Sequence, residues 1–575
     1  MKIPKAGGKN GDFDRLQFFM EVAAACFYSQ KPRIEQYDLL KNYYLFGVQE
    51  QVEGTPYNKI APIIDTLIAF LYSADGTRFS AHLPPEIPAA EWLKIPAITN
   101  AMNSEWMHSG ADQLYGQAVE WASVYNTELV KTLPKKGQIA PYIVDPHCFG
   151  VYREDLNGLD RQEAIAHEYY ISKSQLETEL KDHPNRADIM RRLNPAPLAT
   201  RDEMPESLRR IIVTNMAGIP PLTPGNTVTG NANLWLPDKI EYKPGVSTDV
   251  VKMRELWIRD DDKDGDYQTV TMAQDDIVIY DRENIFVKNE QPFTQVCPLP
   301  MHGYFWGRSI VATLIGLQGW RNIRVDEIQR MLALQAKPPV ALTGWSGMVD
   351  EQNFALNQPG GVLNGSDPMG KVESFAPKVP EDLWRDVQQI DEMFMEAAGL
   401  PPILMGRGES GVRSGRQTSE LSRLGSSRTK KRALCVEDSL ETLATKIYKV
   451  KRKYDDTAYL TEAIDGQPPM KFTFEQAPED TIIKVDAHSN SPLFVEDQKT
   501  LAGELLEAHA IDRASFIEML NPPMKDVLLK KLPLIEKKEA EAQKAKAAHE
   551  EQLAQAKHAP PHPGAKPNGA AGAPH

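Results

Sequence analysis

The string GSDPMGKV at residues 365–372 is the part of the sequence that most resembles a nucleotide-binding motif. A phosphate-binding loop needs a Ser or Thr after its lysine to hold magnesium, and a helix that opens at that point. Here Val372 follows Lys371, Pro368 lies inside the loop, and strand-forming residues come next. The string therefore predicts no nucleotide site.

A run of aspartates at residues 260–266 resembles the opening of a calcium-binding loop. Such a loop supplies carboxylates at alternate positions and ends on a bidentate Glu at its twelfth position. Counted from Asp260, the twelfth residue is Thr271, and strand-like segments flank the run where helices are required. Because Asp and Gly are also the residues that tight turns require, the run predicts a solvated hairpin turn.

Cysteine and histidine spacing predicts neither a metal site nor a catalytic site. The four cysteines form no Cys-x-x-Cys pair, and we expect small buried side chains at Cys26, Cys148, Cys297 and Cys435. Four histidines lie in a low-complexity tail: His549, His558, His562 and His575. The sequence has no Gly-x-Ser-x-Gly or His-Glu-x-x-His pattern. It therefore predicts a protein that is not an enzyme and that uses no cofactor and no metal ion.

A basic segment interrupts this acidic chain. The net charge of -14 disfavours tight nonspecific DNA binding by the whole surface, because such binding depends on neutralising phosphates. Against only Glu409 and Glu420, the segment carries Arg407, Arg413, Arg416, Arg423, Arg428, Lys430, Lys431 and Arg432. Two interpretations stay open: a loop that meets phosphates without reading bases, or a solvated helix face that pairs with acidic neighbours.

Length and composition indicate a folded protein of several parts. A chain of 575 residues exceeds the roughly 250–300 residues that one core supports, and its 43 prolines favour many breaks. The apolar runs at 18–28 and 60–72 are interrupted by Glu21 and Asp65 and are too short to span a membrane. With no secretory signal visible, we expect the protein to mature in a cytoplasm.

Periodicity divides the first half of the chain into helices and strands. Spacings of three and four predict helices over 13–72, with faces formed by Phe18, Phe19, Val22, Tyr37, Leu40, Tyr43, Tyr44, Leu45, Ile60, Ile63, Ile64 and Leu67. Another helix is predicted within 89–129. Strands are predicted at 142–144, 149–152 and 165–171, followed by a helix that opens at Ser172 or Ser174 and continues through Leu180. Residues 255–287 predict an antiparallel meander.

Two long amphipathic helices are predicted around a Gly- and Pro-rich excursion at 340–380. The first runs over 304–335, about 48 Å at ~1.5 Å per residue. Its apolar residues are Ile310, Leu314, Leu317, Ile323 or Val325, Ile328, Met331 and Leu332. The second runs over 381–398 and stops at Gly399. Its apolar residues are Leu383, Val387, Ile390, Phe394 and Ala397. Because such a hairpin would be unstable alone in water, we expect it to pack head to tail against copies of itself.

The C-terminal part contains a Gly- and Arg-rich loop at 404–416 and a long basic helix from about 418 to 454. Strands are predicted within 455–486, and helices over 495–534 with a break at 509–512. From 537 onward the composition predicts a fraying helix followed by disorder.

This order of elements resembles the core of the portal proteins of tailed bacteriophages, the head-tail connectors of podovirus- and siphovirus-like particles. Three strings carry the resemblance: IVDPHCFGVYRED at 143–155, PLPMHGYFWGRSIVATLIGLQGWRNIRVDEIQRML at 298–332, and AAGLPPILMGRGESGVRSGRQTSELSRL at 397–424. In portal proteins an FWG-type turn leads into the first stem helix, a Pro-Pro boundary leads into the clip, and a tunnel loop beginning GLPP follows the second stem helix. The pattern covers about 140–520.

The resemblance implies an α+β, mainly helical fold with wing, stem, clip and crown parts that assembles into a ring. It assigns 1–303 to the wing, with a helical N-terminal part plus antiparallel strands, and 304–336 to the first stem helix. The clip is 337–380, the second stem helix 381–400 and the tunnel loop 401–417. Residues 418–490 form the long wing helix and strands, 491–536 the crown helices, and 537–575 a disordered tail.

The function implied is a portal ring, typically a homododecamer, at one capsid vertex, for packaging and ejecting double-stranded DNA. A mostly acidic channel wall repels the DNA backbone, and a few arginines touch phosphates transiently. The acidic wall is assigned to Asp382, Asp386, Asp391, Glu392 and Glu396. The DNA-contacting tunnel loop is assigned to Arg407, Arg413 and Arg416.

The partners implied are the terminase large subunit and the tail adaptor at the clip, together with the major capsid and scaffolding proteins. The protein would reside in the virion after assembly in the host cytoplasm. Two alternatives stay open: a cytosolic nucleic-acid-acting NTPase or nuclease, which needs a complete phosphate loop or carboxylate cluster, and a non-viral ring scaffold without DNA.

Overall fold

The computed structural model describes residues 1–5, 11–49, 57–72, 77–135, 138–193, 250–336, 340–343, 371–374, 378–400, 427–460, 471–485, 501–508, 510–520, 528, 531–533 and 535–538. The chain divides into two compact units, Met1–Leu493 and Phe494–His575. Both helices and antiparallel sheets are present, which confirms the predicted α+β class.

The N-terminal helices are α1 (Gly11–Cys26), α2 (Gln30–Phe46), α3 (Ile60–Leu71), α4 (Ala89–Trp92), α5 (Ile95–His108) and α6 (Ala111–Tyr125). The predicted faces are largely confirmed: Phe19, Tyr37 and Leu40 are buried, and so are all four predicted residues of α3. Gly47 ends α2 with a φ of 70°, a left-handed conformation that glycine adopts without strain.

A five-stranded antiparallel sheet follows the order β4 (Phe149–Val151), β5 (Ala164–Ser172), β6 (Val250–Arg259), β7 (Tyr267–Ala273) and β8 (Ile277–Glu283). Strands β6 to β8 are the predicted meander. The aspartate run forms the predicted turn, in which Asp264 and Gly265 have positive φ and the Gly265 amide donates to the Asp260 carbonyl. Helix α7 (Lys173–Glu179) begins at Ser172, whose hydroxyl accepts from the Gln175 amide, as predicted. Helix α8 (Arg186–Arg192) contacts β8.

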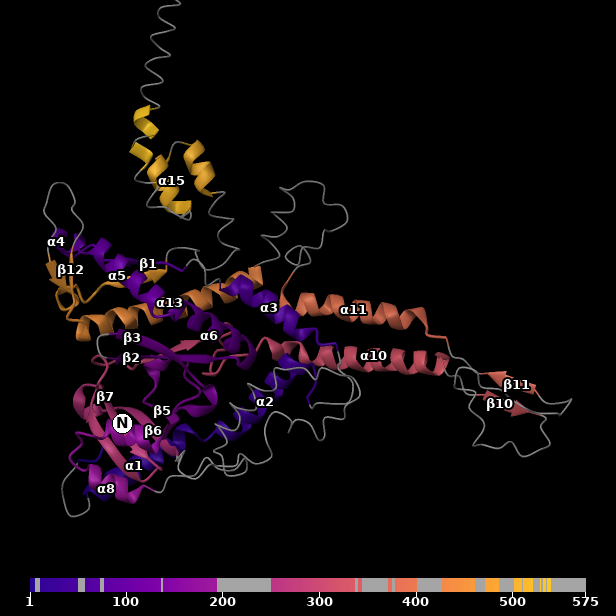
Figure 1. Ribbon diagram of the computed structural model, residues 1–575, viewed down its shortest axis with the longest axis horizontal. Helices are drawn as coiled ribbons and strands as arrows, with labels where there is room; N and C mark the ends of the chain where they lie inside the picture. The colour runs from indigo at the N-terminus through magenta and orange to yellow at the C-terminus, as the bar shows by residue number, and fades with distance from the viewer. Residues whose placement is uncertain are drawn as a thin grey trace, which may run out of the picture. The chain divides into compact units, whose positions relative to one another are not determined.

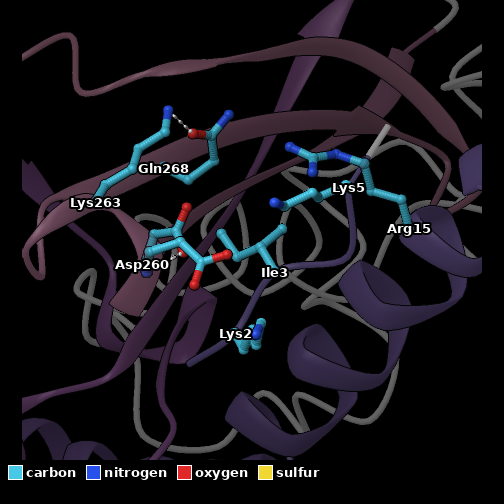
Figure 2. Close-up of a pocket in the computed structure, with 8 residues that line it drawn as sticks. Lys2, Ile3, Lys5, Arg15, Asp260, Lys263 and Gln268 are labelled. Atoms are coloured by element: carbon cyan, nitrogen blue, oxygen red, sulfur yellow. Dashed lines mark hydrogen bonds between the residues drawn. The ribbon is translucent and has the colours of Figure 1, made fainter. Parts of the chain in front are cut away.

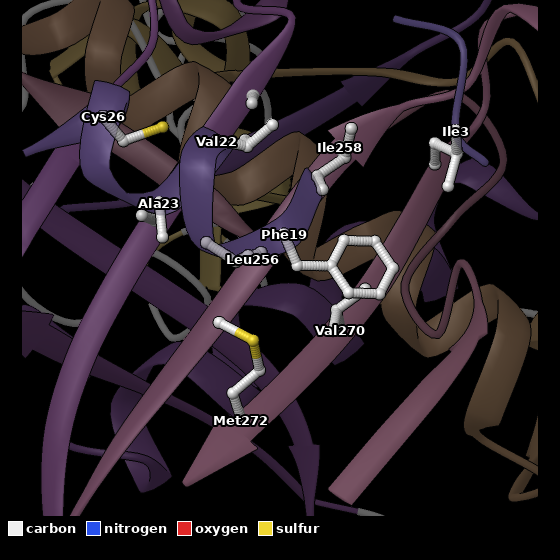
Figure 3. Packing of buried hydrophobic residues seen from close by; sticks show 11 residues of the cluster. Ile3, Phe19, Val22, Ala23, Cys26, Leu256, Ile258, Val270 and Met272 are labelled. Atoms are coloured by element: carbon white, nitrogen blue, oxygen red, sulfur yellow. The ribbon is translucent and has the colours of Figure 1, made fainter. Parts of the chain in front are cut away.

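Helix α1 covers one face of this sheet (Figure 3). Phe19, Val22 and Cys26 on α1 pack with Leu256 and Met272 on β6 and β7 in one buried cluster. Burial raises the pKa of the Cys26 thiol to about 12, so this thiol is inert. Three of the cysteines are buried as predicted; Cys435 is only half-buried, so the prediction is wrong for that residue.

A second, three-stranded sheet has the order β3 (Gln138–Val144), β2 (Glu128–Lys135) and β9 (Phe293–Val296). It contacts the first sheet through aromatic side chains and a buried ion pair. Phe149 and Phe293 have ring centroids 5.0 Å apart, and Lys131 Nζ lies 2.8 Å from Glu255 Oε2. The two sheets therefore share an interior.

The first long helix, α10, spans Ile315–Ala336, so the prediction that it begins at residue 304 is wrong. Residues 304–314 form turns and a short 3-10 helix (Val311–Thr313) in its place. Phe305 and Trp306 are buried there, and the Ser309 hydroxyl donates to the Val124 carbonyl. These buried residues lie in an irregular segment. Its apolar residues are spaced like those on one face of a helix, which explains the wrong prediction.

The second long helix, α11, spans Glu381–Ala398, and Gly399 stops it with a φ of 77°, as predicted. Strand β10 (Val340–Thr343) pairs antiparallel with β11 (Lys371–Ser374) in the intervening excursion. β11 occupies the place that a helix takes in a phosphate-binding loop; residues 365–370 lie outside the described residues.

Helix α13 (Ser427–Tyr454) contacts α3, β2, β9 and β14. Strand β12 (Ala458–Leu460) pairs with β13 (Lys471–Thr473), and β14 (Ile482–Val485) pairs with β1 (Phe79–His82). In the second unit, residues 501–507 are helical and α15 spans Arg513–Leu520, so the predicted break before 513 is confirmed.

Candidate functional site

Helices α10 and α11 form an antiparallel pair (Figure 1). Val387, Ile390 and Phe394 are buried along one face of α11, and Ile328 is buried on α10. These residues agree with the predicted apolar face of α11. All five predicted wall carboxylates lie on α11, whereas Arg407, Arg413 and Arg416 lie outside the described residues.

Two of the five carboxylates are neutralised within the subunit. Asp386 Oδ2 lies 2.7 Å from Arg324 Nε, and Asp391 Oδ1 lies 2.8 Å from Arg321 Nε. Hydrogen bonds to Glu327 and Asp386 raise the pKa of Arg324. The arginines on α10 therefore fix how the two helices face each other, and they reduce the free negative charge that Asp386 and Asp391 present.

The remaining three carboxylates, Asp382, Glu392 and Glu396, are exposed. Asp382 also forms a loose ion pair with Arg385, with 3.7 Å between oxygen and nitrogen. Gln388, Gln389 and Arg385 are exposed beside them, so polar groups cover most of the free face of α11, and Asp382, Glu392 and Glu396 are its acidic members. Such a face can lie near a phosphate backbone without binding it.

The outer side of α10 carries exposed apolar residues. Trp320 is 61% exposed and Ile323 57% exposed. The sequence offered Ile323 or Val325 as a member of the apolar stripe, and Val325 is the less exposed of the two. The other large apolar residues exposed on the pair are Leu332, Leu334, Trp384 and Met393. Exposed Trp and Leu along one helix are typical of a contact surface. The sequence prediction overlooked Trp320, although its spacing from Ile323 and Leu334 already places these residues on one face.

The start of the basic helix α13 binds the end of α11. Arg432 Nη1 donates to the Ala398 carbonyl at 2.6 Å, and Thr429 Oγ1 donates to the Gly399 carbonyl at 3.1 Å. Arg428 Nη1 donates to the Glu396 carbonyl at 3.3 Å. Cations favour a helix C-terminus because its last carbonyls are unpaired and carry partial negative charge. Burial lowers the pKa of Arg432, and the neighbouring Arg428 adds to this effect.

Arg428, Thr429 and Arg432, which we call the clasp, therefore have a structural role. Two residues of the basic segment pair with main-chain carbonyls, and neither interpretation of the sequence included that arrangement. The clasp also holds the end of α11 next to the beginning of α13. The arginines assigned to DNA contact lie in sequence between these two helix ends.

A polar hollow of about 570 Å³ lies near the turn at residues 260–266 (Figure 2). Four cations line it, namely Lys2, Lys5, Arg15 and Lys263, and two of them have acceptor partners. Arg15 forms two hydrogen bonds with the Asp281 carboxylate, and Lys263 Nζ lies 3.1 Å from Gln268 Oε1 and 3.0 Å from Glu283 Oε1. Acidic and basic side chains thus lie side by side around the hollow, with Asp260 and Asp262 among its lining residues.

Among the described residues, no three or more His, Cys, Asp or Glu side chains gather in a way that could hold a metal ion. Asp260 Oδ1 accepts from the Asp262 amide within its turn. In the same part of the chain, no helix has the length and apolar character needed to cross a membrane.

Comparison with known proteins gives a family. Residues 94–488 match the family model described as phage SU10 portal protein. The solved structure "Neck of empty GTA particle computed with C6 symmetry" aligns at 8% identity, with a TM-score of 0.40, and covers 84% of this chain and 93% of that chain. "Virion of native gene transfer agent (GTA) particle" aligns at 9% identity and a TM-score of 0.39, with the same coverage. No curated protein matches. Since the family match spans well over half of the chain, this protein belongs to the phage SU10 portal protein family.

Proposed function

We propose that the chain forms a closed head-to-tail ring, with twelve subunits by resemblance, around a channel at one capsid vertex. Double-stranded DNA enters through it during packaging and leaves through it during ejection. The observation that carries the proposal is the pair α10–α11, which has an apolar outer side and an acidic free face. Membership of a portal family supports the same conclusion.

In this ring the outer side of α10 contacts the neighbouring subunit. Trp320 and Ile323 expose apolar surface that water disfavours, and burial against a second copy removes that cost. Such a contact joins different surfaces of the two copies, so it repeats from subunit to subunit and can close into a ring.

The free face of α11 lines the channel. Asp382, Glu392 and Glu396 supply the repulsion that lets DNA slide, while Asp386 and Asp391 contribute less because they are paired with arginines. Arg407, Arg413 and Arg416 meet phosphates transiently, from the stretch of sequence between the end of α11 and the beginning of α13, which the clasp holds next to each other.

The clip, residues 337–380, docks the terminase large subunit during packaging and the tail adaptor afterwards. Other parts of the ring meet the major capsid and scaffolding proteins. The ring assembles in the host cytoplasm and remains in the virion. These assignments rest on the family resemblance, and β10–β11 is the described element of the clip.

The ring contact is tested with the double variant Trp320→Ser, Ile323→Ser. Both side chains are exposed in the subunit, so their loss leaves the folded chain intact. We expect the association constant between subunits to fall at least tenfold, which corresponds to ~1.4 kcal/mol. Sedimentation velocity and negative-stain images measure the fraction of rings.

The matched control is Phe13→Ser, which removes a side chain that is 68% exposed on α1. It should assemble like the wild type. A wild-type chain that stays monomeric at high concentration would refute the proposed function, and a double variant that assembles normally would refute the assigned contact.

A further inference from the structure

The carboxylate of Asp391 on α11 is shared by two cations from different elements. Its Oδ1 lies 2.8 Å from Arg321 Nε on α10, and its Oδ2 lies 3.0 Å from Lys59 Nζ, immediately before α3. The three side chains are 27%, 10% and 22% exposed, respectively. Salt therefore screens these pairs less than it screens pairs at the open surface.

Helix α10 also binds the main chain that leads into α3. Arg321 Nη1 and Gln318 Nε2 each donate to the Tyr57 carbonyl at 3.2 Å. Gln318 is fully buried, and its Oε1 accepts from the Lys59 amide at 3.0 Å. The Arg321 guanidinium lies 5.1 Å from the centre of the Tyr57 ring. Residues 57–59 are thus held by both their backbone and their side chains.

The end of α2 joins the same group of contacts. Asn322 Nδ2 on α10 donates to the Gly47 carbonyl at 2.8 Å, and Asn58 Nδ2 donates to the Tyr44 carbonyl at 2.6 Å. Elements from the N-terminal helices and from the long helix pair therefore meet around residues 57–59, where Lys59 pairs with Asp391.

We infer that Asp391 is a positioning residue that joins the α10–α11 pair to the segment leading into α3, so that the helix pair and the N-terminal helices move as one body. Asp386 differs from it, because Arg324 on α10 is its partner and both are 41% exposed. If the α10–α11 pair rotates, the ion pairs of Asp391 move α3 with it. Helix α3 in turn contacts α6 and α13. This inference goes beyond the proposed function and does not depend on it.

Hydrogen exchange of the full chain, read by mass spectrometry, tests the inference. Asp391→Asn and Asp386→Asn each remove one negative charge from α11 and keep the side-chain size. We expect amides in residues 57–63 to exchange about tenfold faster in Asp391→Asn and less than about twofold faster in Asp386→Asn. Equal exchange of this segment in the two variants would overturn the inference.

A double-variant cycle separates coupling from general loosening. Lys59→Met removes one of the two cations and leaves the pair between Arg321 and Asp391 in place. The double variant Lys59→Met, Asp391→Asn should exchange faster than the wild type by a smaller factor than the product of the two single-variant factors. The reason is that the two residues act on each other. Effects that multiply without coupling would contradict the inference. Sedimentation of each variant reports on the ring separately, so failure of the ring and failure of this coupling give different results.

Discussion

Lys446 on α13 carries its ammonium group into the interior beside β9. The side chain is 6% exposed, and Nζ donates to the main-chain carbonyl of Phe293. Burial lowers the pKa of Lys446 to about 8, and Asp160 and Glu290 partly oppose this shift. A buried lysine is costly when charged, so the protonation of Lys446 should be visible in the stability of the protein.

The variant Lys446→Met tests this cost as a function of pH. The folded chain releases the Lys446 proton near pH 8, whereas the unfolded chain keeps it up to its ordinary pKa of 10.5. Between these values the unfolded state binds more protons, so the contribution of Lys446 to stability rises with pH. We expect the free energy of unfolding of the wild type to rise relative to Lys446→Met by up to about 3 kcal/mol from pH 7 to pH 10.5.

Urea unfolding of both chains across this range measures the difference, and the contributions of all other titratable groups cancel because both chains contain them. A difference that stays flat from pH 7 to pH 10.5 would show that Lys446 ionises as it does in water.

The five carboxylates of α11 show which properties of single residues could be predicted from the sequence and which could not. All five were predictable as members of one helix, because acidic and apolar positions alternate with helical spacing. Their division into three exposed groups and two paired groups was not predictable, since it depends on which side of α10 carries Arg321 and Arg324. A pairing between two elements far apart in the sequence is set by tertiary packing.

At the scale of elements, the turn before α10 decides where the long helix begins. Gly307 has a φ of 67°, and a Cβ added there would lie 2.4 Å from Cys297 Sγ and 2.8 Å from the Leu299 carbonyl oxygen. Gly303 has a similar φ of 71°, but a Cβ there would meet open space. The backbone at Gly307 is thus both left-handed and closely approached, which a helix through this segment would not allow.

The variant Gly307→Ala should destabilise the chain by more than about 2 kcal/mol, because strain and a clash add together. The control Gly303→Ala should cost only the left-handed conformation, about 1 kcal/mol. Thermal unfolding of the two variants measures the difference. Equal melting temperatures would mean that the contacts around Gly307 yield without cost.

Elements whose ends carry a local signal were predicted well. Gly399 stops α11, Ser172 caps α7, and the Asp- and Gly-rich run turns the chain between β6 and β7. The predicted start of α10 was wrong because Phe305, Trp306 and Ile310 are buried apolar residues of an irregular segment. The spacing of apolar residues indicates which residues are buried. It does not distinguish a helix from an irregular segment that contains several buried residues.

At the scale of the whole molecule, a net charge of -14 means that any attraction for DNA has to come from a few local residues, as the proposed function assumes. Family membership confirms the portal assignment that the order of elements predicted. The subunit number, the partners and the division into wing, stem, clip and crown stay predictions, because they depend on surfaces between chains.

The triple variant Arg407→Ala, Arg413→Ala, Arg416→Ala tests the proposed contact between these arginines and DNA phosphates. We expect intact rings, because the clasp residues are unchanged, together with reduced DNA packaging or retention. The DNA content per particle and negative-stain images of the purified rings measure the two effects. Arg191→Ala, exposed on α8, is a control for loss of positive charge. Wild-type packaging by the triple variant would remove the tunnel-loop assignment.

The clasp has a consequence for how this protein can vary. Because the Arg432 guanidinium and the Thr429 hydroxyl bind the carbonyls of Ala398 and Gly399, the end of α11 and the beginning of α13 lie at neighbouring points. Lengthening a loop with fixed ends adds only a small entropic cost, roughly 0.6 kcal/mol per doubling. Relatives that retain the clasp are therefore free to lengthen, shorten or recharge residues 401–426, and so to adapt to different genomes, without redesigning either helix.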